Sequence, residues 1–415
     1  MIPVYYDETE EAWKKASSSN SNEKYRWYDY GNKKWANSVT VSSTNRSTYQ
    51  KASLGTEIPM DDILTMEVWI PRYKYKVFNY NSDGTKTSSP QQIEITFEKD
   101  NKNTSEISCQ DAISGTEGKP SETCKLKETN STCADSICNN KTYTHPAFTF
   151  GNEEIKGFWI GKFELTGTIS NITTKPNLSS IRDQSVSSYE TNIMNMKNSS
   201  NQYGFSTNTD THMIKNSEWG AVAYLSHSKY GTCINGTCKE IGINNNSNFI
   251  TGCGSTHESS STTTCNAYNT NNGMLASTTG NIYGAYDISG GAYEYTMANI
   301  VSPDGTTMLS GNDTSFNSGY TGKIYNSGKY TSITGLNYPN AKYYDKYSFS
   351  ASHASKIRSK LGDGLKEVNI SSTSWYSDTL SLARHNYPWF RRGGEYNSDA
   401  GGGLFCSDLN TGTNN

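Results

Sequence analysis

The sequence predicts an α+β fold in which short strands dominate and helices are few. Several segments alternate bulky apolar residues with polar residues, which is typical of half-buried strands. Only two segments show a helical pattern. Although just 33% of the 415 residues are hydrophobic, 12% are aromatic, with 29 Tyr and 8 Trp. Disordered chains are poor in aromatic residues, so we expect a folded protein with an aromatic core.

The N-terminal region begins with one of the two helical patterns. Residues 7–18 read DETEEAWKKASS, in which Asp7 suits a helix cap and Glu10 follows three residues later. The acidic start and the lysines near the end suit the helix dipole. Strand patterns follow, and the clearest alternate large and polar residues. We expect strands in EKYRWYDY (23–30), KWANSVTV (34–41), MEVWIPRYKYKVF (66–78) and QQIEITF (91–97).

A change in composition near residues 142–146 suggests a domain boundary, and the chain length suits two or three domains. We expect a β-rich N-terminal region over 1–145, with a polar, Cys-containing insertion at 98–145, and one domain over 146–415. The second region contains a hairpin pattern at 148–167. Residues 213–229 predict an amphipathic helix capped by Asn216 or Ser217. Residues 281–296 read as a turn followed by a strand.

Eight of the nine cysteines fall in two groups of four within polar loops, where zinc binding and disulfide bonding are the two alternatives. The spacings lack the CxxC knuckles and His pairs of zinc sites. We therefore expect disulfides and an oxidising compartment. Four cysteines allow three pairings in each group, and we choose the local ones, leaving Cys406 free: Cys109–Cys124, Cys133–Cys138, Cys233–Cys238 and Cys253–Cys265.

Charge and hydropathy exclude several classes of protein. The net charge is -3 and there is no basic run, so a nucleic-acid partner is not expected. No stretch approaches the ~20 apolar residues of a membrane-spanning helix. No signal-peptide pattern follows Met1. Attachment to a membrane would therefore need a segment outside this sequence.

Four ordered segments resemble the formylglycine-generating-enzyme-like branch of the C-type-lectin fold. They are FWIGKFELT (158–166), the helix pattern with EWGAVAYL (218–225), NIYGAYDISGGAYEYT (281–296) and RGG (392–394). The resemblance implies a C-type-lectin-like domain over the second region. That family usually ends in a closing "G-F-R" strand, which is absent before Asn415, so we expect that strand to lie beyond this sequence or to come from elsewhere.

The final segment narrows the resemblance further. PWFRRGGEY (388–396) and GGLF (402–405) are similar to the variable proteins of diversity-generating retroelements, in which a C-terminal segment is randomised on a fixed scaffold. The Tyr-rich N-terminal region resembles the stalk-like part of bacterial surface proteins. The implied function is an extracellular, cell-surface receptor or adhesin that binds a protein or glycan on another cell or a phage. A receptor-binding protein of a phage virion is the alternative.

This resemblance assigns roles within about 384–412. Residues between the fixed positions would contact the ligand through one exposed face, since Tyr, Arg and Asn side chains suit adaptable binding surfaces. These ligand-binding candidates are Tyr387, Arg391, Glu395, Asn397, Asp399, Gly401, Cys406, Asp408, Leu409 and Thr411. The structural anchors would be Trp389, Phe390, Arg392, Gly393, Gly394, Tyr396 and Phe405.

Enzymatic and metal-binding functions are the weaker hypotheses. Formylglycine-generating enzymes bind copper through two thiols, whereas this C-terminal region has only Cys406. Glu164, Glu218, Asp287 and Glu294 lie inside fold motifs, so we expect structural rather than catalytic roles. The six histidines show no metal or triad spacing, and we expect most at the surface. We predict no catalytic residue and no cofactor, with calcium at Asn281 and Asp287 as the alternative.

Overall fold

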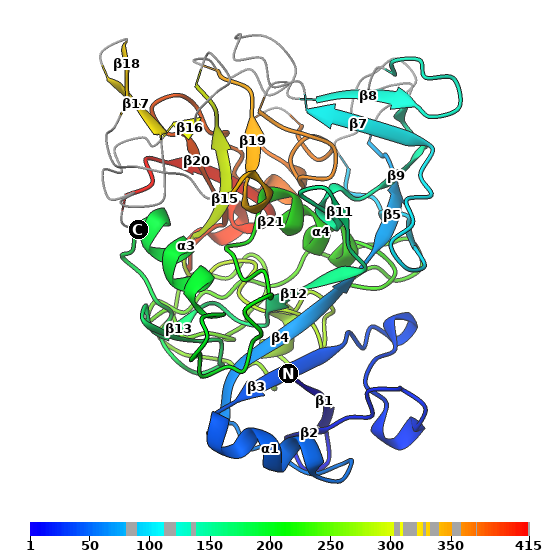
Figure 1. Ribbon diagram of the computed structural model, residues 1–415, viewed down its shortest axis with the longest axis vertical. Helices are drawn as coiled ribbons and strands as arrows, with labels where there is room; N and C mark the ends of the chain where they lie inside the picture. The colour runs from blue at the N-terminus through cyan, green and yellow to red at the C-terminus, as the bar shows by residue number, and fades with distance from the viewer. Residues whose placement is uncertain are drawn as a thin grey trace.

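The computed structural model describes residues 1–79, 89–111, 122–133, 138–302, 308–309, 322–326, 329–332, 340–350, 358–370 and 372–413. Within these ranges the protein is strand-rich and mixed α+β, with three α-helices and several small, mostly antiparallel sheets (Figure 1). Parts of the expected insertion at 98–145 lie outside the described residues, as do most of 303–339 and His353. No helix in the described ranges has the length and apolar character needed to cross a bilayer.

The largest sheet joins the two halves of the chain. Its five antiparallel strands lie in the order β12-β4-β3-β1-β2. In β4, Trp69 pairs with Trp159 of β12, across the boundary expected near residue 145. The N-terminal region therefore packs against the rest of the protein through this sheet (Figure 1). The strands are β1 (Ile2–Asp7), β2 (Ala12–Lys15), β3 (Asn37–Val41), β4 (Ile63–Pro71) and β12 (Gly157–Gly161).

The helix predicted at residues 7–18 is wrong, because this segment forms the β1–β2 hairpin. Asp7 does cap the chain, but it caps a turn: its Oδ1 accepts the backbone N–H groups of Thr9 at 3.0 Å and Glu10 at 3.2 Å. Val4 and Trp13 are buried in the core beneath the sheet. Burial of these flanking aromatic and branched side chains outweighs the local helical preference, which is a weak determinant by itself.

The other N-terminal predictions had mixed outcomes. The strands predicted within 34–41, 66–78 and 91–97 are confirmed. The second range contains β5 (Tyr73–Lys76) and the third contains β6 (Ile95–Phe97). These two strands form a sheet with β9 (Thr142–Thr144). The strand predicted at 23–30 is wrong: this segment contains short 3-10 turns, one of them capped by Asn22. Helix α1 (Ser43–Lys51) was not predicted, since it buries no residue and has no apolar stripe.

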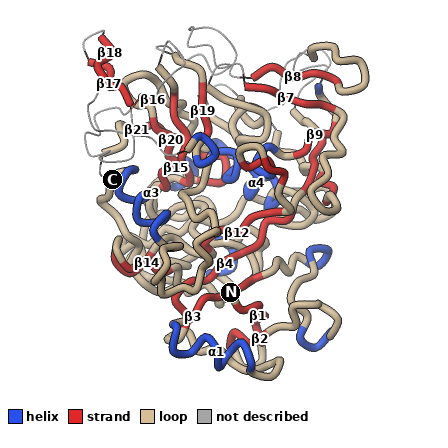
Figure 2. The backbone as a smooth tube through the Cα atoms, viewed as in Figure 1, coloured by secondary structure: helices blue, strands red, loops and turns tan. Residues whose placement is uncertain are grey.

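The helix predicted at 213–229 is present as α4 (Asn216–Ser226), but it is not amphipathic. All eleven of its residues are buried, because it lies in the centre of the protein between the sheets (Figure 2). The cap also differs from the prediction. The N-cap residue is Lys215, whose backbone N–H donates to Glu218 Oε2 at 2.9 Å. The third helix, α3 (Val186–Asn195), begins at Ser185 and was not predicted.

The sheet that contains the C-terminal segment has the strand order β19-β15-β20-β21. Its strands are β19 (Asp345–Tyr347), β15 (Glu294–Ile300), β20 (Trp389–Gly393) and β21 (Gly403–Asn410); β19 is parallel to β15 and the other pairs are antiparallel. The predicted 148–167 hairpin is reduced to the two-residue strands β10 and β11, because β12 leaves it to pair with β4. The remaining strands are β7 (Ile107–Asp111), β8 (Glu122–Leu126), β10 (Thr149–Phe150), β11 (Glu153–Glu154), β13 (Thr166–Thr168), β14 (Asn171–Thr173), β16 (Met308–Leu309), β17 (Gly322–Asn326) and β18 (Lys329–Ser332).

All four predicted disulfides are present: Cys109–Cys124, Cys133–Cys138, Cys233–Cys238 and Cys253–Cys265. Three of the bonded cysteines, Cys124, Cys133 and Cys138, belong to the main hydrophobic core. Four disulfides are typical of proteins that fold in an oxidising compartment.

Thiol chemistry gives the first prediction. Cys406 is the single free thiol and is fully buried, and its burial raises the pKa of the thiol. We expect no reaction of the native protein with iodoacetamide, and one modified cysteine after unfolding without reductant. Non-reducing peptide mapping should recover the four local links. Rapid alkylation of the native protein, or more than one thiol after unfolding, would contradict this arrangement.

Candidate functional site

The β20–β21 hairpin carries most of the residues that the sequence assigned to binding. The expected anchors Trp389, Phe390, Arg392 and Phe405 are all fully buried. Arg392 links β20 to its surroundings by donating to the carbonyls of Cys406 at 2.8 Å and Asp363 at 3.0 Å. This hairpin is therefore rigidly attached to the core.

The turn out of β20 depends on two glycines in the left-handed backbone region. Gly393 has φ +79° and Gly394 has φ +84°. A Cβ at position 393 would lie 2.4 Å from Glu294 Oε2, so no other residue fits there without movement. The two glycines direct the chain into a loop over residues 394–402.

Arg391 is the best-defined candidate. It forms an ion pair with Asp408, which lies opposite it on β21. Its guanidinium also stacks on the ring of Tyr293, 4.2 Å from the ring centre. The Arg391 side chain is only 15% exposed and that of Asp408 is 22% exposed. The two partners hold the guanidinium in one orientation with its edge at the surface.

The loop over 394–402 adds polar groups beside Arg391. Asn397 and Asp399 are exposed, and Glu395 and Gly401 are half-buried. The backbone N–H of Tyr396 donates to the carbonyl of Gly291 at 2.9 Å, which places this loop beside the segment that carries Tyr293 and leads into β15.

A second aromatic cluster, in which two rings meet edge to face, lies next to the loop. The Tyr396 ring contacts Phe249 with 4.8 Å between centroids, and the guanidinium of Arg182 lies 3.9 Å from the Phe249 centroid. We call the combined region the loop surface. It comprises Arg182, Phe249, Tyr293, Arg391, Glu395, Tyr396, Asn397, Asp399 and Asp408.

The ten candidates do not share one face, contrary to our expectation. Leu409 lies opposite Phe390, whereas Asp408 lies opposite Arg391, so the side chains of Asp408 and Leu409 point to opposite faces of the sheet. Tyr387, 37% exposed, and Thr411 lie at the far end of the hairpin from the loop. Cys406 is fully buried and cannot form part of an exposed surface. Strand alternation is the physical reason for this division.

Four residues of the loop surface were missed as binding candidates. Tyr396 was expected to be a buried anchor but is half-buried beside the loop. Tyr293 was read as part of a fold motif, and Phe249 and Arg182 lie in separate polar stretches. No local pattern marks these last three residues, because the tertiary structure brings them to the hairpin from distant parts of the chain.

The motif carboxylates accept hydrogen bonds inside the fold. Asp287 Oδ1 accepts from Asn244 Nδ2 and from the Gly252 backbone N–H, both at 2.8 Å. Glu164 Oε1 accepts the Ala292 N–H at 2.8 Å. Burial raises the pKa of Glu164 to about 8 and that of Asp287 to about 6, and raises the pKa of Glu294 as well.

Glu218 differs from these three groups. It is also buried, but His212 and Lys215 outweigh the desolvation and lower its pKa to about 2. His212 Nε2 lies 3.1 Å from Glu218 Oε1. Because its second oxygen also caps α4, the arrangement stabilises the start of the buried helix.

A cavity of about 520 Å³ lies between β12 and β15. Its lining is mostly apolar, with Phe158, Ile181 and Tyr189 among its walls. The carboxyl and imidazole side chains in the lining are those of Glu67, Glu153, Glu164, Asp210, His212, Glu218, Asp287 and Glu294. The volume falls in the range of small-molecule sites. Burial raises the pKa values of Glu164 and Glu294, so these two groups present little negative charge to the cavity near neutral pH, whereas Glu218, with its lowered pKa, is ionised there.

The groups considered for calcium and copper have other roles in the fold. Asn281 Oδ1 accepts the N–H of Tyr283 at 2.9 Å, and the oxygens of Asp287 accept the bonds described above. Copper binding of the formylglycine-generating type needs two thiolates. All nine cysteines are described, and eight of them are disulfide-bonded, which leaves Cys406 without a second thiolate.

The expectation that most histidines lie at the surface is wrong: none of the five described histidines is exposed, and His212 and His257 each lie against a carboxylate. His145 and His227 are fully buried. Burial lowers their pKa values to about 3 and about 4, so both are neutral inside the protein. His257 Nε2 lies 3.1 Å from Glu240 Oε2, and the spacing of these residues in the sequence did not predict this contact.

Comparison with known proteins gave no match to any protein-family model and no match among curated proteins. The geometry of the residues is therefore the basis for a functional assignment.

Proposed function

We propose that this chain is an extracellular ligand-binding protein of the cell surface, with a C-type-lectin-like domain over 146–415 and a ligand contact at the loop surface. Its ligand is a protein or glycan on another cell or on a phage. The single observation that carries the proposal is the convergence of two arginine–aromatic pairs on one polar loop: Arg391 over Tyr293, and Arg182 over Phe249, whose ring meets Tyr396 edge to face.

The chemistry of this surface suits recognition. Arginine and tyrosine are enriched among the residues that dominate binding energy at interfaces. Here stacking and ion pairing restrict these side chains before a ligand arrives, which lowers the entropy lost on binding. Asn397 and Asp399 add exposed groups that donate or accept hydrogen bonds. A glycan or a polar protein epitope matches such a mixed surface.

The four disulfides support an extracellular location, since they persist in oxidising environments. The buried anchors beneath the hairpin support tolerance of sequence change above them. Surface substitutions usually alter stability by no more than about 0.5 kcal/mol, so a loop attached to such a base can vary while the fold persists.

The test begins with a glycan microarray and a panel of purified cell-surface proteins, with each hit measured by biolayer interferometry. We expect the triple variant Glu395→Ser, Asn397→Ser, Asp399→Asn to keep the wild-type melting temperature and to lose at least about tenfold in affinity, or 1.4 kcal/mol. Asparagine is chosen at 399 because this residue has φ 45°, which Asn tolerates.

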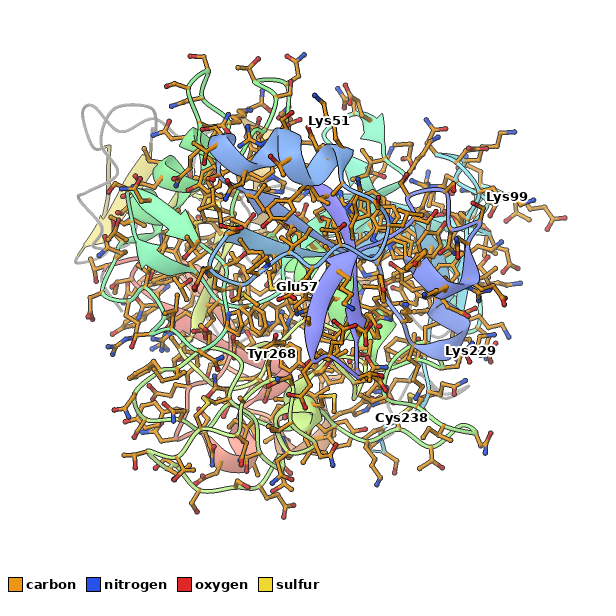
Figure 3. The ribbon with its side chains drawn as sticks, turned by 90° about the horizontal axis from the view of Figure 1, so that it is seen from below. Lys51, Glu57, Lys99, Lys229, Cys238 and Tyr268 are labelled. Atoms are coloured by element: carbon orange, nitrogen blue, oxygen red, sulfur yellow. A yellow bond between two sulfur atoms is a disulfide. The ribbon has the colours of Figure 1, made fainter. Side chains whose placement is uncertain are left out.

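The matched control changes exposed residues elsewhere. Lys51, at the end of α1, and Glu57 are both exposed, and α1 lies at the opposite end of the protein from β20 (Figures 1 and 3). The double variant Lys51→Ser, Glu57→Ser should bind as the wild type does. Equal loss in both variants, or a ligand whose affinity the loop variant leaves unchanged, would refute the proposed binding surface.

A further inference from the structure

A cluster of three potential metal ligands lies away from the loop surface. Glu240, His257 and Asp378 each place one ligand atom within 4.8 Å of the others. They come from three separate parts of the chain: the segment after the Cys233–Cys238 disulfide, the loop closed by Cys253–Cys265, and the turn that follows Trp375. The cluster is therefore formed by the tertiary structure and not by residues that are neighbours in the sequence.

The carboxylate oxygens of this cluster lack the donors that buried oxygens normally have. Asp378 is fully buried and the side chain of Glu240 is 3% exposed. Asp378 Oδ2 accepts the Phe405 N–H at 3.0 Å. The carboxyl groups of Glu240 and Asp378 lie against each other, and among the described residues no N–H or hydroxyl donor reaches Asp378 Oδ1 or either oxygen of Glu240 with hydrogen-bond geometry. Leaving buried acceptors without a partner is costly, so these oxygens point to a missing electropositive group.

No protein cation fills that role among the described residues. Neither carboxylate has an ion pair with Lys or Arg, and His257 Nε2 approaches Glu240 Oε2 at 3.1 Å without hydrogen-bond geometry. The guanidinium of Arg392 donates to the Cys406 and Asp363 carbonyls and makes no ion pair with Asp378. A pair of adjacent buried carboxylates therefore faces an imidazole with no compensating charge.

The backbone beside the cluster leaves room for the carboxylates to converge. An ideal Cβ at Gly403 would lie 2.1 Å from Glu240 Oε1 and 2.4 Å from Asp378 Oδ2. A side chain at position 403 would therefore occupy the space into which both carboxylates project beside β21.

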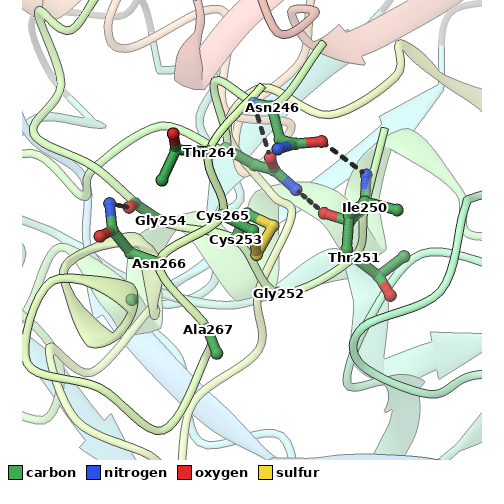
Figure 4. The surroundings of a disulfide bond; sticks show 12 residues. Asn246, Ile250, Thr251, Gly252, Cys253, Gly254, Thr264, Cys265, Asn266 and Ala267 are labelled. Atoms are coloured by element: carbon green, nitrogen blue, oxygen red, sulfur yellow. Dashed lines mark hydrogen bonds between the residues drawn. A yellow bond between two sulfur atoms is a disulfide. The ribbon is translucent and has the colours of Figure 1, made fainter. Parts of the chain in front are cut away.

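The loop that carries His257 is held in place by its own network. The Cys253–Cys265 disulfide closes the loop, and Asn266 Nδ2 donates to the Gly254 carbonyl at 2.9 Å (Figure 4). On the other side of the disulfide, Asn246 Oδ1 accepts the Ile250 N–H at 3.3 Å (Figure 4). These contacts restrict the backbone three residues before His257.

We propose that Glu240, His257 and Asp378 bind one divalent transition-metal ion, with Zn²⁺ as the reference ion. One imidazole nitrogen and two carboxylates form a ligand set that zinc accepts at about 2.0–2.2 Å, leaving a fourth position for water. Ligand atoms around such an ion lie roughly 3.4 Å apart, so the present cluster closes with small side-chain rotations. Calcium would need six to eight oxygens. The ion would join three distant segments behind β21, independently of the proposed ligand surface.

The experiment uses the purified chain with its disulfides intact, since reduced cysteines would bind zinc themselves. After chelator treatment and dialysis, ZnCl₂ is titrated by isothermal calorimetry, with CaCl₂ as a comparison. We expect one Zn²⁺ per chain, a raised melting temperature and no comparable effect of Ca²⁺. The Co²⁺ form should show d–d bands without a thiolate charge-transfer band.

Three variants test the ligands: Glu240→Gln, His257→Gln and Asp378→Asn. Each should lower the affinity for Zn²⁺ by at least about 100-fold while the metal-free protein stays folded by circular dichroism. The matched control is Glu258→Gln, an exposed carboxylate next to His257, which should bind zinc as the wild type does. The proposal is overturned if Zn²⁺ does not bind at 1:1, or if binding survives in all three variants. The first outcome would mean that the two carboxyl groups share a proton instead.

Discussion

Replacing Trp389 with alanine should lower the free energy of unfolding by about 3–5 kcal/mol, the usual cost of removing a buried aromatic side chain. Trp389 is 0% exposed and belongs to a cluster with Val186, Met213, Tyr295 and Met297. That cluster joins β15, β20 and helix α3, so the cavity left by truncation would affect several elements at once. Urea unfolding followed by circular dichroism measures the change.

The matched control lies two residues earlier in the chain. Tyr387 is also aromatic but is 37% exposed, and Tyr387→Ala should cost no more than about 0.5 kcal/mol. A Trp389→Ala protein as stable as Tyr387→Ala would show that the hairpin is not attached to the core in the way described. The proposal of a variable loop over a fixed base would then lose its physical support.

The second large effect concerns pH. Glu67 and Glu190 are buried, and burial raises the pKa of each from an ordinary value of 4.5 to about 7. Between pH 4.5 and 7, both glutamates therefore keep a proton in the folded protein that they have already released in the unfolded chain. Stability from these two groups is complete below pH 4.5 and is lost as the pH rises through 7. The loss is about 3 kcal/mol for each group, from 1.4 kcal/mol per pKa unit.

The double variant Glu67→Gln, Glu190→Gln isolates this contribution. Glutamine keeps the volume of each side chain, and its amide oxygen at position 190 still accepts the Met213 N–H. Between pH 4.5 and 8 we expect the variant to gain several kcal/mol of stability relative to the wild type, measured by urea unfolding at each pH.

Comparison with the wild type is needed because the buried neutral histidines act in the opposite direction. The lowered pKa values of His145 and His227 make the protein more stable as the pH rises toward 6.5. This contribution is common to both proteins and cancels in the difference. Parallel stability curves for variant and wild type would show that the two carboxyl groups titrate normally.

Local sequence patterns were sufficient to predict single strands and helices, and disulfides between cysteines that are close in the sequence. Alternation predicted the strands β3, β4 and β5, and short spacing within each group predicted all four disulfides. Helix α4 was predicted from the spacing of its apolar residues. The α+β class follows from these elements, and the identity of the buried anchors Trp389 and Phe405 followed from the motifs around them.

Only the tertiary structure determined which distant segments of the chain lie side by side. It turned the helical pattern after Asp7 into a hairpin, because the aromatic residues there are buried in a sheet shared with β12. It divided Asp408 and Leu409 between opposite faces, buried Cys406, and brought Phe249 and Tyr293 to the loop surface. It also assembled Glu240, His257 and Asp378. Contacts between residues more than a hundred positions apart leave no periodic signal in the chain, and they depend on packing that only the folded protein defines.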